Sequence, residues 1–314
     1  MKPDYYVFNG DADGLFAAHQ IRLQRGDAPA VTGVKRDIQL LERLQDQSDQ
    51  GIVVCDISLD KNRLPLEKML GQGCQIEWYD HHHAGEIPAH PGLQTRIDQA
   101  ATVNSSSIVY QALATGDPRW AIAGLFGDNM ADSAMKLAQA HQIPTKEREG
   151  LQELGQLLNY NAYGASLEDL IFDPSQIFAQ MERMQSPTEL LQEGSMIPKL
   201  RATYKEDLAQ AEGKEELQSG VLILPDKPWA GRIVGDFAYR FQARYPGKAV
   251  AILLERADGS FQASLRVPAE HQIGAADFCM RFPTGGGRKT AAGINRLGPD
   301  QLEGFLKEFQ TSYH

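Results

Sequence analysis

The chain has 314 residues, of which 42% are hydrophobic, and its formal net charge is −10. This length predicts two domains, each able to bury a core of its own. The acidic charge argues against tight, sequence-independent binding of long DNA or RNA, which needs a basic face, but it is compatible with a small anionic ligand. No apolar run approaches the ~18 residues of a membrane span, and the N-terminus lacks the apolar stretch of a secretory signal. We therefore expect a cytoplasmic protein with no membrane partner.

The first half of the chain alternates short apolar runs with helical patterns, which predicts an α/β domain with a parallel sheet. Strands are expected at 5–8, 51–57 and 75–79, and helices after Gly14, from about 105 to 116 and from 118 to 141. A cluster of polar residues follows each strand directly. Since open α/β sheets hold their ligands at the carboxyl edge of the strands, these clusters predict a site there.

Residues 186–219 are polar and helix-prone, without a strand pattern, which is typical of a linker helix and a surface loop. We therefore expect an N-terminal domain at 1–185, a linker at 186–219 and a smaller α/β domain at 220–314. In the last domain we expect a strand at 221–224, a helix at 233–243, a hairpin of 249–255 and 260–267, a Gly-rich loop at 285–287 and a helix near 300–310.

Carboxylates and imidazoles gather at these strand ends and turns. The residues concerned are Asp11, Asp13, Asp56, Asp80, His81, His82 and Asp128. Each acidic residue alone could be a turn or a helix cap, but their joint occurrence in this order predicts a metal centre. Oxygen and imidazole ligands without a thiolate suit Mn²⁺ or Mg²⁺. Four carboxylates and two divalent ions sum to about zero charge, which makes such a cluster tolerable when buried.

The order of these motifs closely resembles the DHH phosphoesterase superfamily. It is carried by Asp11-Ala12-Asp13-Gly14, Val54-Cys55-Asp56, Asp80-His81-His82 and Gly127-Asp128. The run from Gly285 to Gly293 is similar to the signature of the DHH-associated substrate domain, so that the two matches cover nearly the whole chain except the linker. The resemblance implies a parallel-sheet catalytic domain and a smaller substrate domain, with the active site in the cleft between them. Relatives include single-strand exonucleases, nanoRNases, cyclic-dinucleotide phosphodiesterases and exopolyphosphatases.

The resemblance also implies two Mn²⁺ ions, with Mg²⁺ as an alternative. Asp11 would bind the first ion and Asp13 the second, while Asp56 would bridge both. His81 and Asp128 would complete the shell of the second ion. A water or hydroxide on the ions would be the nucleophile.

His82, the second histidine of the motif, would face the scissile phosphate, and it is assigned with Asp56 to catalysis. His83 lies outside the motif and receives no role. Asn9 stands where relatives carry His or Asp, so its neutral amide oxygen would be a weaker ligand of the first ion.

On the substrate side, Arg288 stands where relatives carry His, and its guanidinium can pair with a phosphate or with the edge of guanine. Gly285, Gly286 and Gly287 are expected to bind an anion together with Arg288. Arg266 matches an arginine common in the associated domain and is predicted to bind phosphate; the alternative is an edge-strand residue that serves solubility. Asn104 begins a helix that lies near the substrate in relatives, or it only caps that helix. The pair Lys35-Arg36 is predicted to be solvated.

From these features we expect a Mn²⁺-dependent phosphodiesterase that cleaves linear dinucleotides such as pGpG or pApA to mononucleotides by a two-metal mechanism. The partner is then a short nucleotide, because the sequence offers no basic track for a long strand. The oligomeric state is left open between a monomer and a homodimer. Two alternatives remain: an exopolyphosphatase or other small phosphoanhydride hydrolase on the same metals, and a non-catalytic nucleotide sensor, which the departures at Asn9 and Arg288 suggest.

Overall fold

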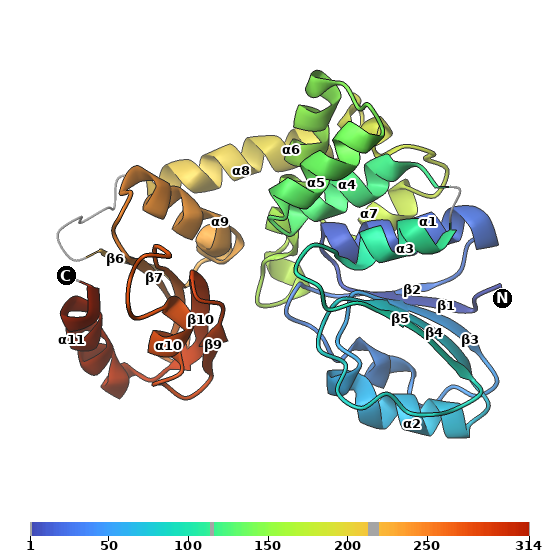
Figure 1. Cartoon of the computed structure of the whole chain (residues 1–314), viewed down its shortest axis with the longest axis horizontal. Helices are drawn as coiled ribbons and strands as arrows, with labels where there is room; N and C mark the ends of the chain where they lie inside the picture. The colour runs from blue at the N-terminus through green and yellow to red at the C-terminus, as the bar shows by residue number, and fades with distance from the viewer. Residues whose placement is uncertain (1, 114–115, 213–219, 314) are drawn as a thin grey trace. The chain divides into compact units, whose positions relative to one another are not determined.

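The computed structural model describes residues 2–113, 116–212 and 220–313 of the chain. The chain divides into two compact units, Met1–Ala202 and Thr203–His314 (Figure 1). The boundary lies within helix α8 (Ile197–Ala211), inside the segment 186–219 that the sequence predicted as a linker. None of the helices in the described ranges combines the length and the apolar character that a membrane crossing requires.

The first unit contains a five-stranded sheet in the order β2-β1-β3-β4-β5. Every pairing in it is parallel, which confirms the predicted sheet. The strands are β1 (Tyr5–Phe8), β2 (Ala30–Val31), β3 (Gly51–Cys55), β4 (Gln75–Asp80) and β5 (Leu93–Ile97). The sequence did not predict β2 or β5, because β2 has only two residues and β5 is an edge strand that alternates with polar side chains.

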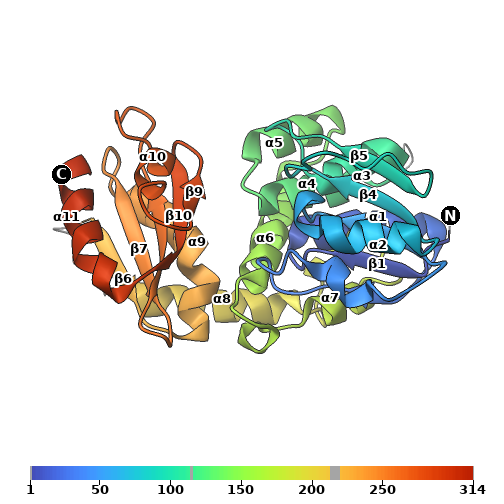
Figure 2. The same ribbon diagram turned by 90° about the horizontal axis from the view of Figure 1, so that it is seen from below.

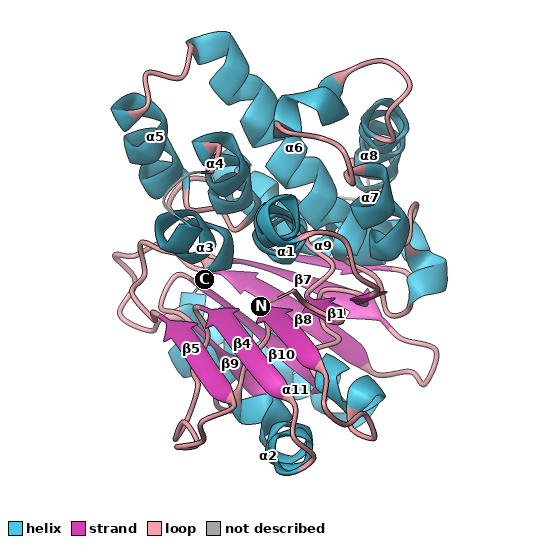
Figure 3. Ribbon diagram, turned by 90° about the vertical axis from the view of Figure 1, so that its right-hand side faces the viewer, coloured by secondary structure: helices cyan, strands magenta, loops and turns pink. Residues whose placement is uncertain are grey.

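Helices cover both faces of this sheet (Figure 3). On one face α2 (Arg63–Gly71) and the 3₁₀ helix η1 (Leu40–Leu44) bury leucine and methionine side chains against Val54 and Trp78. On the other face lie α1 (Ala12–Arg25) and α3 (Ser105–Leu113). Beyond them pack α4 (Pro118–Gly127), α5 (Ala131–Ala140), α6 (Thr145–Ala162) and α7 (Pro174–Gln180), with short 3₁₀ helices at Asp60–Asn62, Leu167–Asp169 and Pro187–Leu191.

The helix predicted from 118 to 141 is wrong as one continuous element, since the structure divides it into α4 and α5. Asn129 has a φ of 58°, a left-handed conformation that a helix interior does not accept. At the preceding Gly127, an added Cβ would lie 2.7 Å from the Cβ of Ala12, so glycine allows α4 to pack closely on α1. The break places Asp128 at the end of α4, beside the start of α1.

The second unit has a mixed sheet in the order β6-β7-β8-β10-β9. Its strands are β6 (Val221–Leu224), β7 (Val250–Glu255), β8 (Phe261–Arg266), β9 (Gly285–Gly287) and β10 (Ala291–Leu297). The β7–β8 hairpin is antiparallel, as predicted, whereas β6 pairs with β7 in parallel. Helix α9 (Pro228–Arg244) covers one face, and α10 (Ala275–Cys279) and α11 (Leu302–Tyr313) pack aromatic side chains on the other; the 3₁₀ helix Pro299–Gln301 leads into α11 (Figure 2).

The run Gly285–Gly287, predicted as a loop, is instead strand β9, which pairs with β10. Its glycines allow a close approach of backbones. A Cβ at Gly285 would clash with the carbonyl group of Cys279, and Gly287 has a φ of 145°. Two of the three glycines therefore have a structural role at this edge of the sheet.

Candidate metal centre

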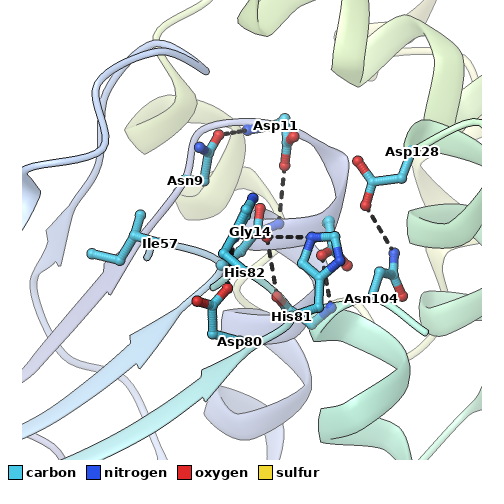
Figure 4. Close-up of polar contacts among 12 residues, drawn as sticks. Asn9, Asp11, Gly14, Ile57, Asp80, His81, His82, Asn104 and Asp128 are labelled. Carbon is cyan, nitrogen blue, oxygen red and sulfur yellow. Dashed lines mark hydrogen bonds and ion pairs between the residues drawn. The ribbon is translucent and has the colours of Figure 1, made fainter. Parts of the chain in front are cut away.

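The carboxyl ends of β1, β3 and β4 bring the predicted residues together (Figure 4). Asp11 follows β1 and caps α1, Asp56 follows β3, and Asp80 is the last residue of β4. Asp56 has a φ of 59°, and its backbone N–H donates to the carbonyl oxygen of Tyr79 at 3.0 Å. This left-handed conformation turns the chain at the strand end and is tolerated by aspartate better than by most residues.

The N-terminus of α3 is directed at two of these carboxylates. The backbone N–H groups of Ser105 and Ser106 donate to the two carboxylate oxygens of Asp13, at 2.8 and 2.7 Å. The Ser105 hydroxyl donates to Oδ1 of Asp56 at 3.0 Å. Because both Asp13 and Asp56 are at most 2% exposed, these hydrogen bonds fix the two side chains in place.

The two histidines of the motif have different surroundings. Nε2 of His81 lies 3.4 Å from Oδ1 of Asp56, inside the carboxylate cluster. Nδ1 of His82 is 2.7 Å from Oδ1 of Asp80, a fully buried carboxylate that can only accept, so the proton lies on Nδ1. The His82 side chain is 45% exposed, which leaves its Nε2 available to a substrate.

Among the described residues, two groups of side chains have the geometry of a cation site. The donor atoms of Asp13, His81 and Asp128 lie within 4.8 Å of one another, and so do those of Asp56, His81 and His82. All of these donors are oxygen or imidazole nitrogen, which suits a hard divalent ion such as Mn²⁺ or Mg²⁺.

The charge of the cluster also fits a bound cation. Burial, together with the neighbouring charge of Asp11, raises the pKa of Asp56 to about 6. Burial and the charges of Asp56 and Asp128 raise the pKa of Asp13 well above its usual range. Although burial opposes it, the hydrogen bond and charge of Asp56 raise the pKa of His81 to about 10. All three shifts have their origin in an excess of buried negative charge, which a divalent ion would relieve.

Asn104, predicted near the substrate, lies fully buried beside this cluster. Its Nδ2 donates to Oδ2 of Asp128 at 3.2 Å, and its Oδ1 accepts from the backbone N–H of Ser107. Asn9 uses both polar atoms within the protein: Oδ1 accepts from the N–H of Asp11 at 3.3 Å, and Nδ2 donates to the carbonyl oxygen of Lys35 at 3.0 Å. The ligand role of Asn9 and the substrate role of Asn104 stay predictions.

Lys35 is the residue of this site that sequence reasoning missed, and the prediction that it is solvated is wrong. Its Nζ forms an ion pair with Asp11, lies 3.5 Å from Oδ1 of Asp128 and donates to Oδ1 of Asn159 at 2.7 Å. Burial opposes its charge, yet Asp11 and Asp128 raise the pKa of Lys35 well above the usual range, so it is a permanent cation. No periodicity marks it in the sequence, because it lies in an irregular connection between β2 and η1.

The other predicted substrate residues belong to the second unit. Arg266 on β8 is only 8% exposed; it donates to the carbonyl oxygens of Leu265 and Gly235 at 2.8 and 3.2 Å, and its guanidinium lies 3.9 Å from the Tyr239 ring centre. Arg288 is exposed at the turn between β9 and β10. The roles predicted for Arg266, Arg288 and the three glycines of β9 stay predictions.

We expect Mn²⁺ to stabilise the metal-free protein, because it binds the folded cluster and not the unfolded chain. At a concentration 100 times Kd the gain is about 2.7 kcal/mol, which corresponds to a rise in Tm of roughly 5–10 °C for a unit of this size. Calorimetry with and without a chelator measures it. The variant Asp13→Asn should show a smaller rise, and an unchanged Tm of the wild type would argue against the site.

No family model and no curated protein sequence matches the chain. Solved structures that match 98% of it include RecJ with Mn²⁺ from Thermus thermophilus (TM-score 0.59, 14% identity, 51% of that chain covered). They also include exonuclease RecJ bound to manganese (TM-score 0.60, 13% identity, 89% of that chain) and the pGpG-specific phosphodiesterase PggH from Vibrio cholerae (TM-score 0.56, 12% identity, 99% of that chain). The chain thus spans about half the length of the Thermus protein. At these identities the likeness concerns the fold, and it confirms the fold that the resemblance to the DHH phosphoesterase superfamily predicted.

Proposed function

We propose that the chain is a divalent-metal-dependent phosphoesterase that hydrolyses short linear nucleotides, with dinucleotides such as pGpG or pApA as substrates and Mn²⁺ as the ion. The observation that carries this proposal is the convergence of carboxylates and two histidines at one edge of the sheet. In it, His81 lies among the carboxylates while His82 is paired with Asp80 and exposed.

The roles of the side chains follow from their contacts. Asp13, Asp56, His81 and Asp128 would hold the ion, which supplies polarisation of phosphoryl oxygens and a lowered pKa of water. The backbone N–H groups of Ser105 and Ser106 at the start of α3 hold the Asp13 carboxylate in place without a bound ion.

His82 is placed to donate a proton. Although burial opposes it, the hydrogen bond with Asp80 raises the pKa of His82, which favours the protonated ring at neutral pH. With Nδ1 bonded to Asp80, the Nε2–H group can donate to the phosphate or to the departing oxygen. Asp80 is a positioning residue, since it acts only through His82.

Three features support a short substrate. The chain carries a net charge of −10, whereas a track for a long strand would be basic. The chain matches nearly all of PggH, a phosphodiesterase specific for pGpG. In the second unit, Arg288 and Lys289 are exposed side by side at the β9–β10 turn, where two cations could meet a terminal phosphate or a guanine edge.

We expect Arg288→Ala to raise KM for a dinucleotide about tenfold or more, as the loss of a charge-assisted hydrogen bond predicts, and to leave kcat and Mn²⁺ affinity unchanged. Steady-state kinetics with pGpG checks this. Arg296→Ala is the matched control, because Arg296 lies on β10 of the same sheet and pairs with the exposed Asp258. Equal KM values for Arg288→Ala and the wild type would remove Arg288 from the binding site.

Product analysis by chromatography tests the proposed function. Parallel reactions contain pGpG, pApA, a longer RNA and polyphosphate, each with Mn²⁺ and with Mg²⁺, and the Asp56→Asn variant as the inactive control. Rapid release of mononucleotides from a dinucleotide, with slow attack on the longer RNA, would support the proposal. Phosphate from polyphosphate alone would favour the phosphoanhydride alternative, and nucleotide binding without turnover of any substrate would favour a sensor.

A further inference from the structure

Lys35 lies on the Asp11 side of the carboxylate cluster. Its ammonium group contacts Asp11, lies 3.5 Å from Asp128 and donates to Asn159 on α6. The ring centre of Tyr163 is 5.6 Å away. One side chain therefore connects the start of α1, the end of α4 and the last turn of α6.

The backbone around Lys35 is held at several points. Its N–H donates to the carbonyl oxygen of Ala162 at 2.9 Å, and its carbonyl oxygen accepts from Asn9 at 3.0 Å. Nearby, a Cβ added at Gly10 would clash with the carbonyl oxygen of Gly33, so the backbone before Lys35 lies in close contact with the β1–α1 connection. These contacts anchor the Lys35 segment against the β1–α1 connection, which makes the lysine a built-in part of the site.

The two residues expected to be specific to the first metal ion, Asn9 and Asp11, already have partners. Oδ1 of Asp11 accepts from the N–H of Gly14 at 3.1 Å, as the cap of α1, and Oδ2 receives the ammonium of Lys35. Asn9 accepts from Asp11 and donates to Lys35.

A cation and a neutral donor have different consequences for a carboxylate oxygen. An N–H group, such as those that Asp13 receives from α3, uses one lone pair and leaves the other for an ion. An ammonium group in contact with Asp11 repels any divalent ion on the same oxygen, and the repulsion is strong where burial reduces screening. Asp11 is therefore a poor ligand, whereas Asp13 remains a good one.

We infer that Lys35 occupies the position of the first cation, so that the centre takes a single divalent ion held by Asp13, Asp56, His81 and Asp128. This inference rests on the proposed function, and it replaces the two ions that the sequence predicted by one ion and one fixed ammonium group. Charge alone does not decide the number: with Lys35 in place, the four carboxylates keep about −1 with one ion and reach about +1 with two. The contact between Lys35 and Asp11 decides it.

The number and environment of bound ions test this inference without any assay of activity. Metal-free full-length protein is titrated with Mn²⁺, and bound ions are counted by calorimetry and native mass spectrometry. Electron paramagnetic resonance then distinguishes an isolated Mn²⁺ from two neighbouring, spin-coupled ions. For the wild type we expect one Mn²⁺ per chain and the six-line spectrum of an isolated ion.

Variants extend the test. Lys35→Ala is expected to bind a second Mn²⁺ and to show the coupled spectrum. Adding Asn9→Asp to Lys35→Ala supplies another carboxylate and should tighten the second site at least tenfold. Lys68→Ala, which removes an exposed ion pair with Asp46, is the matched control and should stay at one ion. If Lys35→Ala does not fold, Lys35→Met keeps the length of the side chain and takes its place.

Two tightly bound, coupled ions in the wild type would overturn the inference, since Lys35 would then yield its position to a metal. So would a single ion in the Lys35 variants, or no ion in the wild type. A failure of the proposed function is distinguishable from a failure of this inference. If the wild type binds one ion but cleaves none of the four substrates, the proposed function is refuted and the inference stands. If the wild type binds two ions and cleaves pGpG, the inference is refuted and the proposed function stands.

Discussion

Replacing Asp56 with asparagine is expected to lower kcat about 10³-fold or more, because it removes several kcal/mol of transition-state stabilisation through the bound ion. The same change should raise the stability of the metal-free protein by about 0.5–2 kcal/mol, since it removes one buried negative charge beside Asp11. Asparagine has the shape of aspartate and tolerates the φ of 59°, so the strand end should keep its conformation. Kinetics with pGpG and denaturation in a chelator measure the two effects.

The gain in stability should depend on pH. The pKa of Asp56 is raised to about 6 in the fold, above its usual 3.8, so its ionisation costs stability at higher pH. The advantage of Asp56→Asn is therefore largest above pH 6 and shrinks as the pH falls, disappearing below the unfolded-state pKa of 3.8, where the carboxyl group is neutral in both states. Asp46→Asn is the control, because its side chain is 85% exposed and should change neither quantity. An active or less stable Asp56→Asn variant would contradict the assignment.

His82→Ala should lower kcat about 10²–10⁴-fold, the range for a lost general acid, while the number of bound Mn²⁺ ions stays the same. The neighbouring His83 is a control of the same residue type, since its side chain is exposed and its backbone carbonyl oxygen accepts from the Ser58 hydroxyl. Steady-state kinetics and metal analysis of both alanine variants check this. A His82→Ala protein that loses Mn²⁺ would show that His82 is a ligand of the ion. The distance of 3.9 Å between Nδ1 of His82 and Oδ1 of Asp56 is compatible with that role.

The ends of β3 and β4 could be predicted from the sequence for a simple physical reason. β3 is fully buried and reads as a short apolar run, and β4 carries the buried pair Trp78-Tyr79 near its end; the first polar residue after each is Asp56 or Asp80. Once the strands are parallel, their ends must meet at one edge. The positions of Asp11, Asp13 and His81 follow from the same topology.

Lys35 could not be predicted in this way. Its partners Asn159 and Ala162 lie more than 120 residues further along the chain, and they are brought near by the packing of α6, which periodicity does not specify. The break after α4 had a signal in Gly127 and Asn129, residues that favour a helix end. Strand β9 had none, because glycine is depleted in strands and Gly285–Gly287 forms one through its pairing with β10.

The residues of the metal centre are far apart in the sequence, and this has a consequence for folding during protein synthesis. Asp11 and Asn159 are joined through Lys35, so the cluster is complete only after α6 has left the ribosome. A nascent chain that ends before Thr145 already contains all five strands of the first sheet and every carboxylate of the site. It lacks α6, the helix that anchors the ammonium group of Lys35. Such contacts between distant segments form late in folding. Metal capture should therefore follow the folding of residues up to Ala162, and a premature stop before that point would leave Lys35, the internal counter-ion of the cluster, without its anchors Asn159 and Ala162.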